Sequence, residues 1–173
     1  MRKVKVVPYN NKWPAMFQEE EDRIRNVFDS EVIEIHHIGS TSVKGLMAKP
    51  IIDIMPVVKD INNVDFFDEQ MIILGYKPIG ENGITGRRFF EKGGDDRTHH
   101  VHIFEQGSED IVRHLAFRDY LREYPAFSER YGNLKIELAK QFPFDMKAYI
   151  NGKNDLVKQI EKNALDWHKK NNV

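Results

Sequence analysis

The sequence contains no cysteine among its 173 residues. This absence excludes disulfide bonds and thiolate chemistry, and it is typical of a protein that works in a reducing cytosol. The sequence also lacks any apolar run that approaches the roughly 20 residues of a membrane-spanning helix. Its N-terminal stretch, MRKVKVVPYN, lacks the long apolar segment and the cleavage site of a signal peptide. We therefore expect a cytoplasmic protein that has no membrane partner.

The sequence also lacks an excess of charge of either sign. It has 26 Lys and Arg residues and 27 Asp and Glu residues, for a net charge of −1 at pH 7. Broad binding of nucleic acid needs a basic surface, so this balance disfavours a nucleic-acid partner. A local basic cluster can still bind a single phosphate. The chain has no internal repeat, and its length suffices to bury one sizeable core. We predict a single domain over residues 1–173, and the sequence leaves the oligomeric state open.

The hydrophobic pattern predicts an α+β fold. The expected elements are a helix over 14–28, strands over 31–39 and 49–58, a helix over 63–75, strands over 76–80, 86–92 and 98–105, and helices over 108–124, 125–142 and 145–170. The strand KPIIDIMPVV is almost continuously apolar, as expected in the middle of a sheet that helices cover. The second helix should be capped by Asn62 or Asn63 and should end at Gly75. The predicted fold is thus a core over 1–107, made of a mixed sheet of about five strands with flanking helices, followed by a helical C-terminal third over 108–173.

One carboxylate, Asp53, interrupts the apolar strand. A buried carboxylate is costly without a partner. On a strand, Asp53 points away from the face that Ile52 and Ile54 occupy. It must therefore emerge at a cleft, meet a cation or bind a metal. A structural ion pair is the alternative, with Arg87 or Arg88 as the obvious donor.

Two histidines share one face of a later strand. In RTHHVHIFE, His100 and His102 lie on one face, while Val101 and Ile103 lie on the other, which is the face expected to enter the core. The two imidazoles would project together as metal ligands, proton carriers or phosphate donors. His99 would hydrogen-bond inward. The alternative is that the histidines are structural.

Several groups could bind phosphate. Gly39 and Ser40 form a turn after a strand, and the exposed amides and hydroxyl of such a turn can hold a phosphate, although an ordinary strand-to-helix turn is the alternative. Arginine recognises phosphate through two N–H groups and lysine as a point charge. Gly152, in YINGK, is poor in a helix interior and would permit a close approach. The basic candidates are Lys49, Arg87, Arg88, Arg97, Lys135 and Lys153, and the adjacent arginines 87 and 88 point to opposite faces of their strand.

The Gly39-Ser40 turn, separated by twelve residues from an acid in an apolar strand, resembles the signature of the nucleotidyltransferase superfamily. More specifically, HIGSTSVKGLMAKPIIDI together with RRFFEKGGDDRTHHVHIFE resembles the GrpB-like family, a small bacterial family assigned to that fold. The resemblance runs from PYNNKWPAMF through FRDYLREYP to YINGK and so covers nearly the whole chain. GrpB-like domains also occur fused to dephospho-coenzyme A kinase, which implies nucleotide or coenzyme chemistry.

The resemblance implies roles for part of the site. Gly39 and Ser40 match the phosphate-side turn, with Thr41 beside them as a further substrate-binding candidate. Asp53 matches the first metal carboxylate. The second carboxylate should fall at position 55, which is Met55. A thioether cannot replace a carboxylate for a hard cation such as Mg²⁺.

The third acidic position of the superfamily falls on a later neighbouring strand. There this chain offers His100 and His102, with Glu105 at the strand end. One carboxylate, Asp53, with two imidazoles suits Zn²⁺ or Mn²⁺ better than Mg²⁺. The resemblance therefore implies a divalent metal site of altered composition.

Two functions follow from these residues. The first is an enzyme that handles a nucleotide or other phosphorylated small molecule, with nucleotidyl transfer as the nearest chemistry. The second is a catalytically silent module that binds a nucleotide or coenzyme, or that helps a partner enzyme such as a dephospho-coenzyme A kinase. Met55 favours the second function, and a metal-dependent hydrolase is a weaker third. In the first function Asp53, His100 and His102 are catalytic and metal-binding, and Gly39, Ser40, Thr41, Lys49, Arg87, Arg88 and Lys153 supply the substrate-binding candidates.

Overall fold

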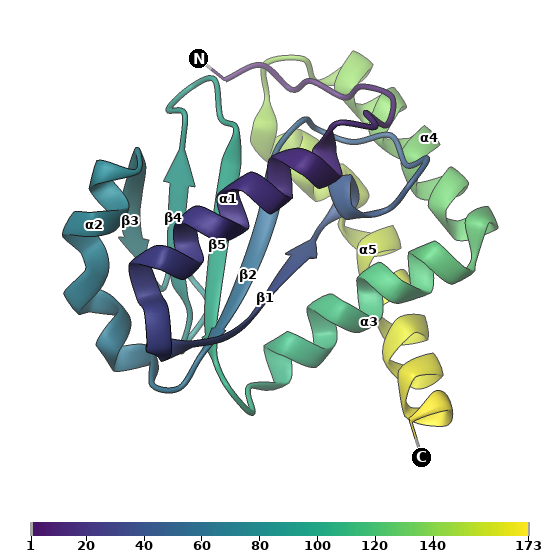
Figure 1. Ribbon diagram of the computed structural model, residues 1–173. Helices are drawn as coiled ribbons and strands as arrows, with labels where there is room; N and C mark the ends of the chain where they lie inside the picture. Colours follow the sequence, from purple (N-terminus) through teal and green to yellow (C-terminus); the bar gives the residue numbers. More distant parts are fainter. Residues whose placement is uncertain (1, 173) are drawn as a thin grey trace. The chain divides into compact units, whose positions relative to one another are not determined.

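The computed structural model describes residues 2–172, which form two compact units made from different stretches of the chain (Figure 1). The first, here called the sheet unit, contains residues 11–38 and 51–111. The second, here called the helical unit, contains the residues up to 10, residues 39–50 and the residues from 112 onward. The organisation as a single domain stays a prediction.

Five strands form the sheet of the sheet unit. They are β1 (Val32–Ile38), β2 (Ile52–Val58), β3 (Tyr76–Gly80), β4 (Arg88–Lys92) and β5 (His99–Glu105), in the order β1-β2-β5-β4-β3. β2 and β5 run parallel, and the other neighbouring strands run antiparallel. The apolar strand β2 lies between β1 and β5, so it occupies the sheet interior as its sequence predicts. A mixed five-stranded sheet with flanking and C-terminal helices confirms the α+β fold.

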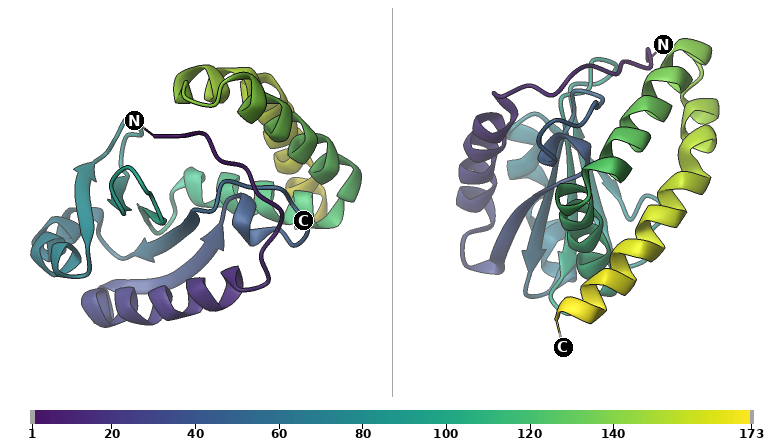
Figure 2. Two further views of the ribbon diagram at one scale, coloured as in Figure 1. Left: turned by 90° about the horizontal axis from the view of Figure 1, so that it is seen from above. Right: turned by 90° about the vertical axis from the view of Figure 1, so that its right-hand side faces the viewer.

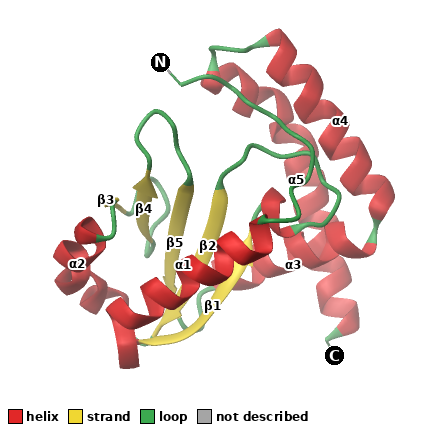
Figure 3. Ribbon diagram, turned by 45° about the horizontal axis from the view of Figure 1, so that its top comes forward, coloured by secondary structure: helices red, strands yellow, loops and turns green. Residues whose placement is uncertain are grey.

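Two helices accompany this sheet, α1 (Trp13–Phe28) and α2 (Asp68–Ile73). α1 lies along one face of the sheet and contacts β1 and β2 (Figures 2 and 3), whereas α2 contacts β3. Ile24 of α1 and Ile54 of β2 are fully buried. Residues alternate between the two faces of a strand, so Asp53 lies on the face opposite to this apolar core.

The predicted helix over 63–75 takes a different form. Residues Ile61–Phe67 form 3₁₀ turns, and only Asp68–Ile73 is α-helical. The side chain of Asp60 accepts a hydrogen bond from the backbone N–H of Asn62 at 2.9 Å, so the cap precedes both predicted asparagines. Gly75, with a φ of +99°, ends the helix as expected.

A buried carboxylate anchors α1 to the far strands of the sheet. Glu20 is 1% exposed, and its carboxylate accepts hydrogen bonds from Tyr76 Oη at 2.7 Å and Lys92 Nζ at 3.0 Å. Arg23 donates to the second carboxylate oxygen at 2.9 Å. Burial raises the pKa of Glu20, but these hydrogen bonds and the lysine charge outweigh it and leave the pKa below its ordinary value.

The helical unit contains α4 (Pro125–Gln141), α5 (Met146–Asn171) and most of α3 (Glu109–Glu123). α3 and α5 each begin with a side chain that accepts a backbone N–H: Ser108 accepts from Asp110, as predicted, and Asp145 accepts from Ala148. α4 begins with a proline, which suits the first helical turn. No helix among residues 2–172 has the length and apolar character that a membrane span requires.

Gly152 lies at a close contact between α5 and α4. A Cβ atom at this position would lie 2.5 Å from Cδ2 of Leu138. Leu138 and Tyr149 belong to one buried apolar cluster of the helical unit. The glycine in YINGK therefore serves helix packing, which gives the close approach that its helical position predicts.

Candidate functional site

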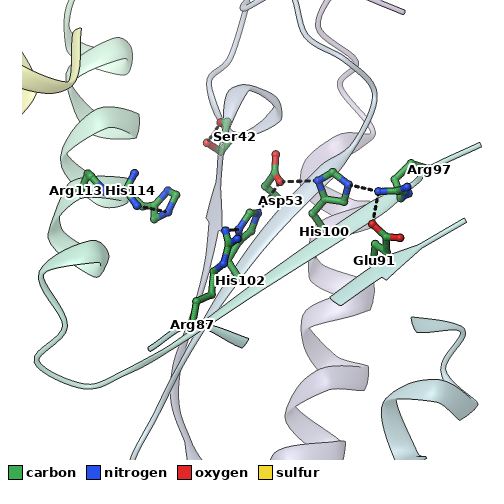
Figure 4. A network of polar contacts seen from close by, with 10 residues as sticks. Ser42, Asp53, Arg87, Glu91, Arg97, His100, His102, Arg113 and His114 are labelled. Carbon is green, nitrogen blue, oxygen red and sulfur yellow. Dashed lines mark hydrogen bonds and ion pairs between the residues drawn. The ribbon is translucent and has the colours of Figure 1, made fainter. Parts of the chain in front are cut away.

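Asp53, His100 and His102 come together on one face of the sheet. In the parallel pairing of β2 with β5, Asp53 is the register partner of His100, and His102 follows two residues later on the same face. Oδ1 of Asp53 lies 3.0 Å from Nε2 of His102 and 3.5 Å from Nδ1 of His100 (Figure 4). Among the described residues, these three form a group whose donor atoms all lie within 4.8 Å of one another. Their donor spacing is compatible with one metal ion.

The two imidazoles determine the electrostatics of Asp53. Its side chain is 25% exposed, and those of His100 and His102 are 18% and 12% exposed. Burial raises the pKa of Asp53, but the hydrogen bonds from both histidines outweigh it and hold the pKa well below its ordinary range. Asp53 is therefore a carboxylate at neutral pH, and its partners are histidines rather than either predicted arginine.

The two arginines that sequence reasoning offered to Asp53 lie elsewhere. Arg88 donates from Nε to Oδ1 of Asp65 at 2.8 Å, in an ion pair with the 3₁₀ turns that precede α2. Arg87 is 6% exposed and donates to two backbone carbonyls, those of Glu81 at 3.1 Å and Asn82 at 2.7 Å. Its Nη1 lies 3.4 Å from Nδ1 of His102, so Arg87 contacts one of the two histidines that face Asp53.

A third arginine, Arg97, contacts the ring nitrogen of His100 that does not face Asp53. Its Nη1 lies 3.0 Å from Nε2 of His100 and 2.6 Å from a carboxylate oxygen of Glu91. Nε of Arg97 donates to the carbonyl of Gly94 at 2.9 Å. Glu91 is also the register partner of His100 in the antiparallel pairing of β4 with β5. The sequence marks Arg97 only as a basic residue, because the contact of its guanidinium with His100 depends on how the loop between β4 and β5 folds.

The residues at the two further carboxylate positions that the resemblance implies are not part of this group. Met55 is fully buried. Glu105, at the end of β5, accepts a hydrogen bond from the backbone N–H of Ile61 at 3.1 Å. His99 is buried, with its ring centroid 6.4 Å from that of Tyr76, and its Nδ1 lies 2.8 Å from Oγ1 of the adjacent Thr98. The cluster therefore contains one carboxylate and two imidazoles.

The Gly-Ser turn belongs to the helical unit. Gly39 has a φ of +73°, which favours glycine, and Ser40–Ser42 form one 3₁₀ turn. The guanidinium of Arg122 donates two hydrogen bonds, at 3.0 and 2.7 Å, to the backbone carbonyl of Ser42. Nζ of Lys135, on α4, donates to Oγ of Ser40 at 2.7 Å. Two helices of the same unit thus fix the turn.

Three lysines of the helical unit gather over two tyrosine rings. Nζ of Lys135 lies 4.3 Å from the centre of the Tyr131 ring, and Nζ of Lys153 lies 5.9 Å from it. Lys153 and Lys49 lie 5.2 and 5.3 Å from the centre of the Tyr149 ring. Lys135 is only 2% exposed. We call Lys49, Lys135 and Lys153 the lysine group.

The lysine group includes two residues that the sequence nominated for substrate binding, Lys49 and Lys153. The link between Lys135 and Ser40 was missed, since the two lie 95 positions apart in the chain. A signal for Lys135 does exist in the sequence. It lies four residues after Tyr131 and three before Leu138, both buried, so it lies on the buried face of α4.

The fold defines the class of protein. Its similarity to the Cid1 poly(U) polymerase has a TM-score of 0.51 at 14% identity and covers 76% of this chain and 43% of the polymerase. Identity this low shows the fold alone, which is nucleotidyltransferase-like. A much nearer structure is that of the conserved protein GrpB from Enterococcus faecalis, with a TM-score of 0.92 at 42% identity over 95% of this chain and 99% of that one. The family model described as GrpB protein matches residues 3–163, and the chain belongs to the GrpB family.

Two curated relatives extend the comparison. UPF0157 protein YqkA of Bacillus subtilis is 53% identical over 171 residues, which cover 99% of this chain and 50% of the relative. The chain thus spans half the length of that protein. A dephospho-CoA kinase of Mycolicibacterium paratuberculosis is 24% identical over 95% of this chain and 46% of the kinase.

Proposed function

We propose that this protein binds a nucleotide or other phosphorylated small molecule, with the phosphates held by the lysine group and the Gly39–Ser42 turn. The observation that carries this proposal is the buried ammonium of Lys135 on the hydroxyl of Ser40, 2.7 Å away. Lys135 is 2% exposed, and its bond to Ser40 places a fixed positive charge directly on the Gly-Ser turn. Such a placement favours phosphate, because lysine binds phosphate as a point charge.

The clustering of charge favours an anion with more than one negative charge. Lys135 and Lys153 share the Tyr131 ring, and Lys153 and Lys49 share the Tyr149 ring. Ammonium groups over aromatic rings are attracted by the ring faces, but they repel one another. A di- or triphosphate would relieve that repulsion, and the Ser40 hydroxyl could turn to a phosphate oxygen.

A metal is the second part of the proposal. The nucleotidyltransferase fold implies Mg²⁺ ions held by paired carboxylates, and the residues here do not fit such a pair, because position 55 is a buried methionine. Asp53, His100 and His102 fit a single transition-metal ion such as Zn²⁺ or Mn²⁺ in donor type and mutual distance. When bound, such an ion would supply a Lewis acid for phosphate oxygens.

A catalytically silent module is the second candidate function. Met55 favours it, since nucleotidyl transfer ordinarily relies on two metal ions that neutralise the charge developing on the phosphates. The similarity to about half of a dephospho-CoA kinase suggests the setting in which such a module would act, as a helper of a coenzyme-handling partner.

Thermal-shift measurements with ATP test the binding proposal. ATP should raise the melting temperature of the wild-type protein and should raise it much less in Ser40→Ala. Ser30→Ala, which removes an exposed hydroxyl of the sheet unit, is the matched control and should respond like wild type. Equal shifts in Ser40→Ala and wild type would remove the turn from the binding site.

Label transfer separates the two candidate functions. An enzyme should move label from α-³²P-ATP to an acceptor in the presence of Zn²⁺ or Mn²⁺, and Asp53→Ala should abolish the transfer. A silent module should bind ATP without any transfer.

A further inference from the structure

Each histidine of the Asp53 group contacts an arginine through the ring nitrogen that does not face Asp53. A guanidinium has five N–H donors and no acceptor, so any ring nitrogen that bonds to it must present a lone pair. Nε2 of His100 faces Nη1 of Arg97 at 3.0 Å, which assigns the lone pair to Nε2. A neutral His100 then carries its proton on Nδ1, directed at Asp53 (Figure 4).

The same direction of hydrogen bonding holds for His102. Its Nδ1 faces Nη1 of Arg87 at 3.4 Å, and its Nε2 faces Asp53 at 3.0 Å. The proton of a neutral His102 therefore lies on Nε2, again directed at Asp53. Both imidazoles donate to one carboxylate, and neither directs a lone pair into the group.

Metal binding requires the opposite arrangement. A ligating imidazole presents its lone pair to the ion, and its other nitrogen usually donates to a carboxylate, a carbonyl or water. In His100 and His102, moving the proton to the other nitrogen would set an N–H against a guanidinium. Each guanidinium also adds a positive charge behind a ligand of a cation.

The two arginines are held in place by groups other than the histidines. Arg87 is bonded to the carbonyls of Glu81 and Asn82, and Arg97 is bonded to the carbonyl of Gly94 and to Glu91. Turning either guanidinium away would break these bonds as well. Arg97 opposes metal binding more strongly, because its contact with the imidazole is the shorter of the two.

We propose that Arg97, assisted by Arg87, is a positioning residue that holds His100 and His102 closed onto Asp53 and thereby weakens the binding of a borderline divalent metal at this group. The proposal rests on the metal site of the proposed function. Glu91 provides an alternative hydrogen-bond partner for His100. It is the cross-strand partner of His100, so it can accept the Nε2–H of that ring once Arg97 no longer intervenes.

Titration with Co²⁺ and Zn²⁺ tests this proposal, with Co²⁺ absorption as a signature of the coordination. Arg97→Gln, which removes the guanidinium and offers an acceptor, should bind both ions at least about tenfold more tightly than wild type, in line with the effect of outer-shell partners on metal affinity. Arg88→Gln is the matched control, since Arg88 pairs with Asp65, and it should bind within about twofold of wild type. Asp53→Ala should abolish the binding that Arg97→Gln strengthens.

Two results would overturn the proposal. If Arg97→Gln binds Co²⁺ no more tightly than wild type does, Arg97 has no control over the site, while the metal site itself stands. If neither protein binds Co²⁺ or Zn²⁺ while ATP still shifts the melting temperature of both, the metal site fails together with this proposal and the phosphate site stands. Arg97→Lys, which keeps the charge and a donor, should behave like wild type.

Discussion

Nη1 of Arg97 lies 3.0 Å from Nε2 of His100, while the other nitrogen of that ring faces Asp53. This contact makes the histidine a bridge between a guanidinium and a carboxylate. A bridge of this kind has a direction, since the guanidinium can only donate and the carboxylate can only accept. The direction sets which ring nitrogen holds the proton.

The first prediction concerns those protons. In long-range ¹H–¹⁵N correlation spectra, the neutral form of His100 should be the Nδ1–H tautomer and the neutral form of His102 should be the Nε2–H tautomer. In Arg97→Gln, His100 should shift toward Nε2–H, whereas His102 should keep its tautomer. An Nε2–H tautomer of His100 in the wild-type protein would contradict the direction inferred from Arg97.

The second prediction concerns Glu20 and pH. The pKa of Glu20 lies below its ordinary value of 4.5, so the unfolded chain binds more protons than the native protein near that pH. The stability that the ionised carboxylate contributes is therefore present above pH 4.5 and is lost as the pH falls through that value and toward the lower native pKa. Glu20→Gln should lower the free energy of unfolding at pH 7 by about 1–3 kcal/mol.

Urea unfolding at a series of pH values checks this prediction. The difference between wild type and Glu20→Gln should shrink as the pH falls from 7 to 3. Glu21→Gln is the control, because Glu21 pairs with Arg25 on the surface of α1, and it should change stability by well under about 1 kcal/mol. A Glu20 effect that is the same at both pH values would show that the charge of the carboxylate does not matter.

The third prediction compares two glycines inside helices. Gly152→Ala should lower the free energy of unfolding by about 1–2 kcal/mol, because its Cβ would overlap Leu138, and this overlap outweighs the gain in helix propensity. Gly132→Ala should be neutral or stabilising by up to about 1 kcal/mol, since its Cβ would meet Leu46 and Met47 at 3.4 Å. Thermal unfolding of both variants measures the contrast. If Gly152→Ala proves as neutral as Gly132→Ala, the helices can adjust to the added methyl group without a loss of stability, which would contradict the prediction.

Much of the fold could be predicted from the sequence because its strong signals are local. Strand β2 shows a nearly unbroken apolar run, and α1 shows apolar residues at helical spacing. The helix expected over 63–75 was wrong in its first half, where Ile61–Phe67 form 3₁₀ turns after the Asp60 cap. Hydrophobic spacing over so short a segment does not distinguish 3₁₀ turns from α-helix.

The candidate site could likewise be predicted only where local patterns in the sequence determine it. The approach of His100 and His102 to one acid follows from strand alternation, once Asp53 is placed on a neighbouring strand. The roles of Arg97 and Lys135 depend on contacts that sequence spacing does not specify, a guanidinium that meets the ring of His100 and a helix that meets a turn 95 positions away. Arg87 was nominated for phosphate, yet its guanidinium is engaged by backbone carbonyls and a histidine, and its role in binding stays a prediction.

Phosphate binding by the lysine group is the central claim, and calorimetric titration of ATP into wild type, Lys135→Met and Lys140→Met tests it most directly. Methionine keeps the length and burial of the side chain at position 135 and removes only the charge and its hydrogen bonds. Lys140 is exposed on the same helix and controls for the loss of one positive charge. We predict that Lys135→Met weakens ATP binding by about tenfold or more while Lys140→Met leaves it nearly unchanged. Equal affinity in Lys135→Met and wild type, or no binding of ATP by wild type, would contradict the proposal.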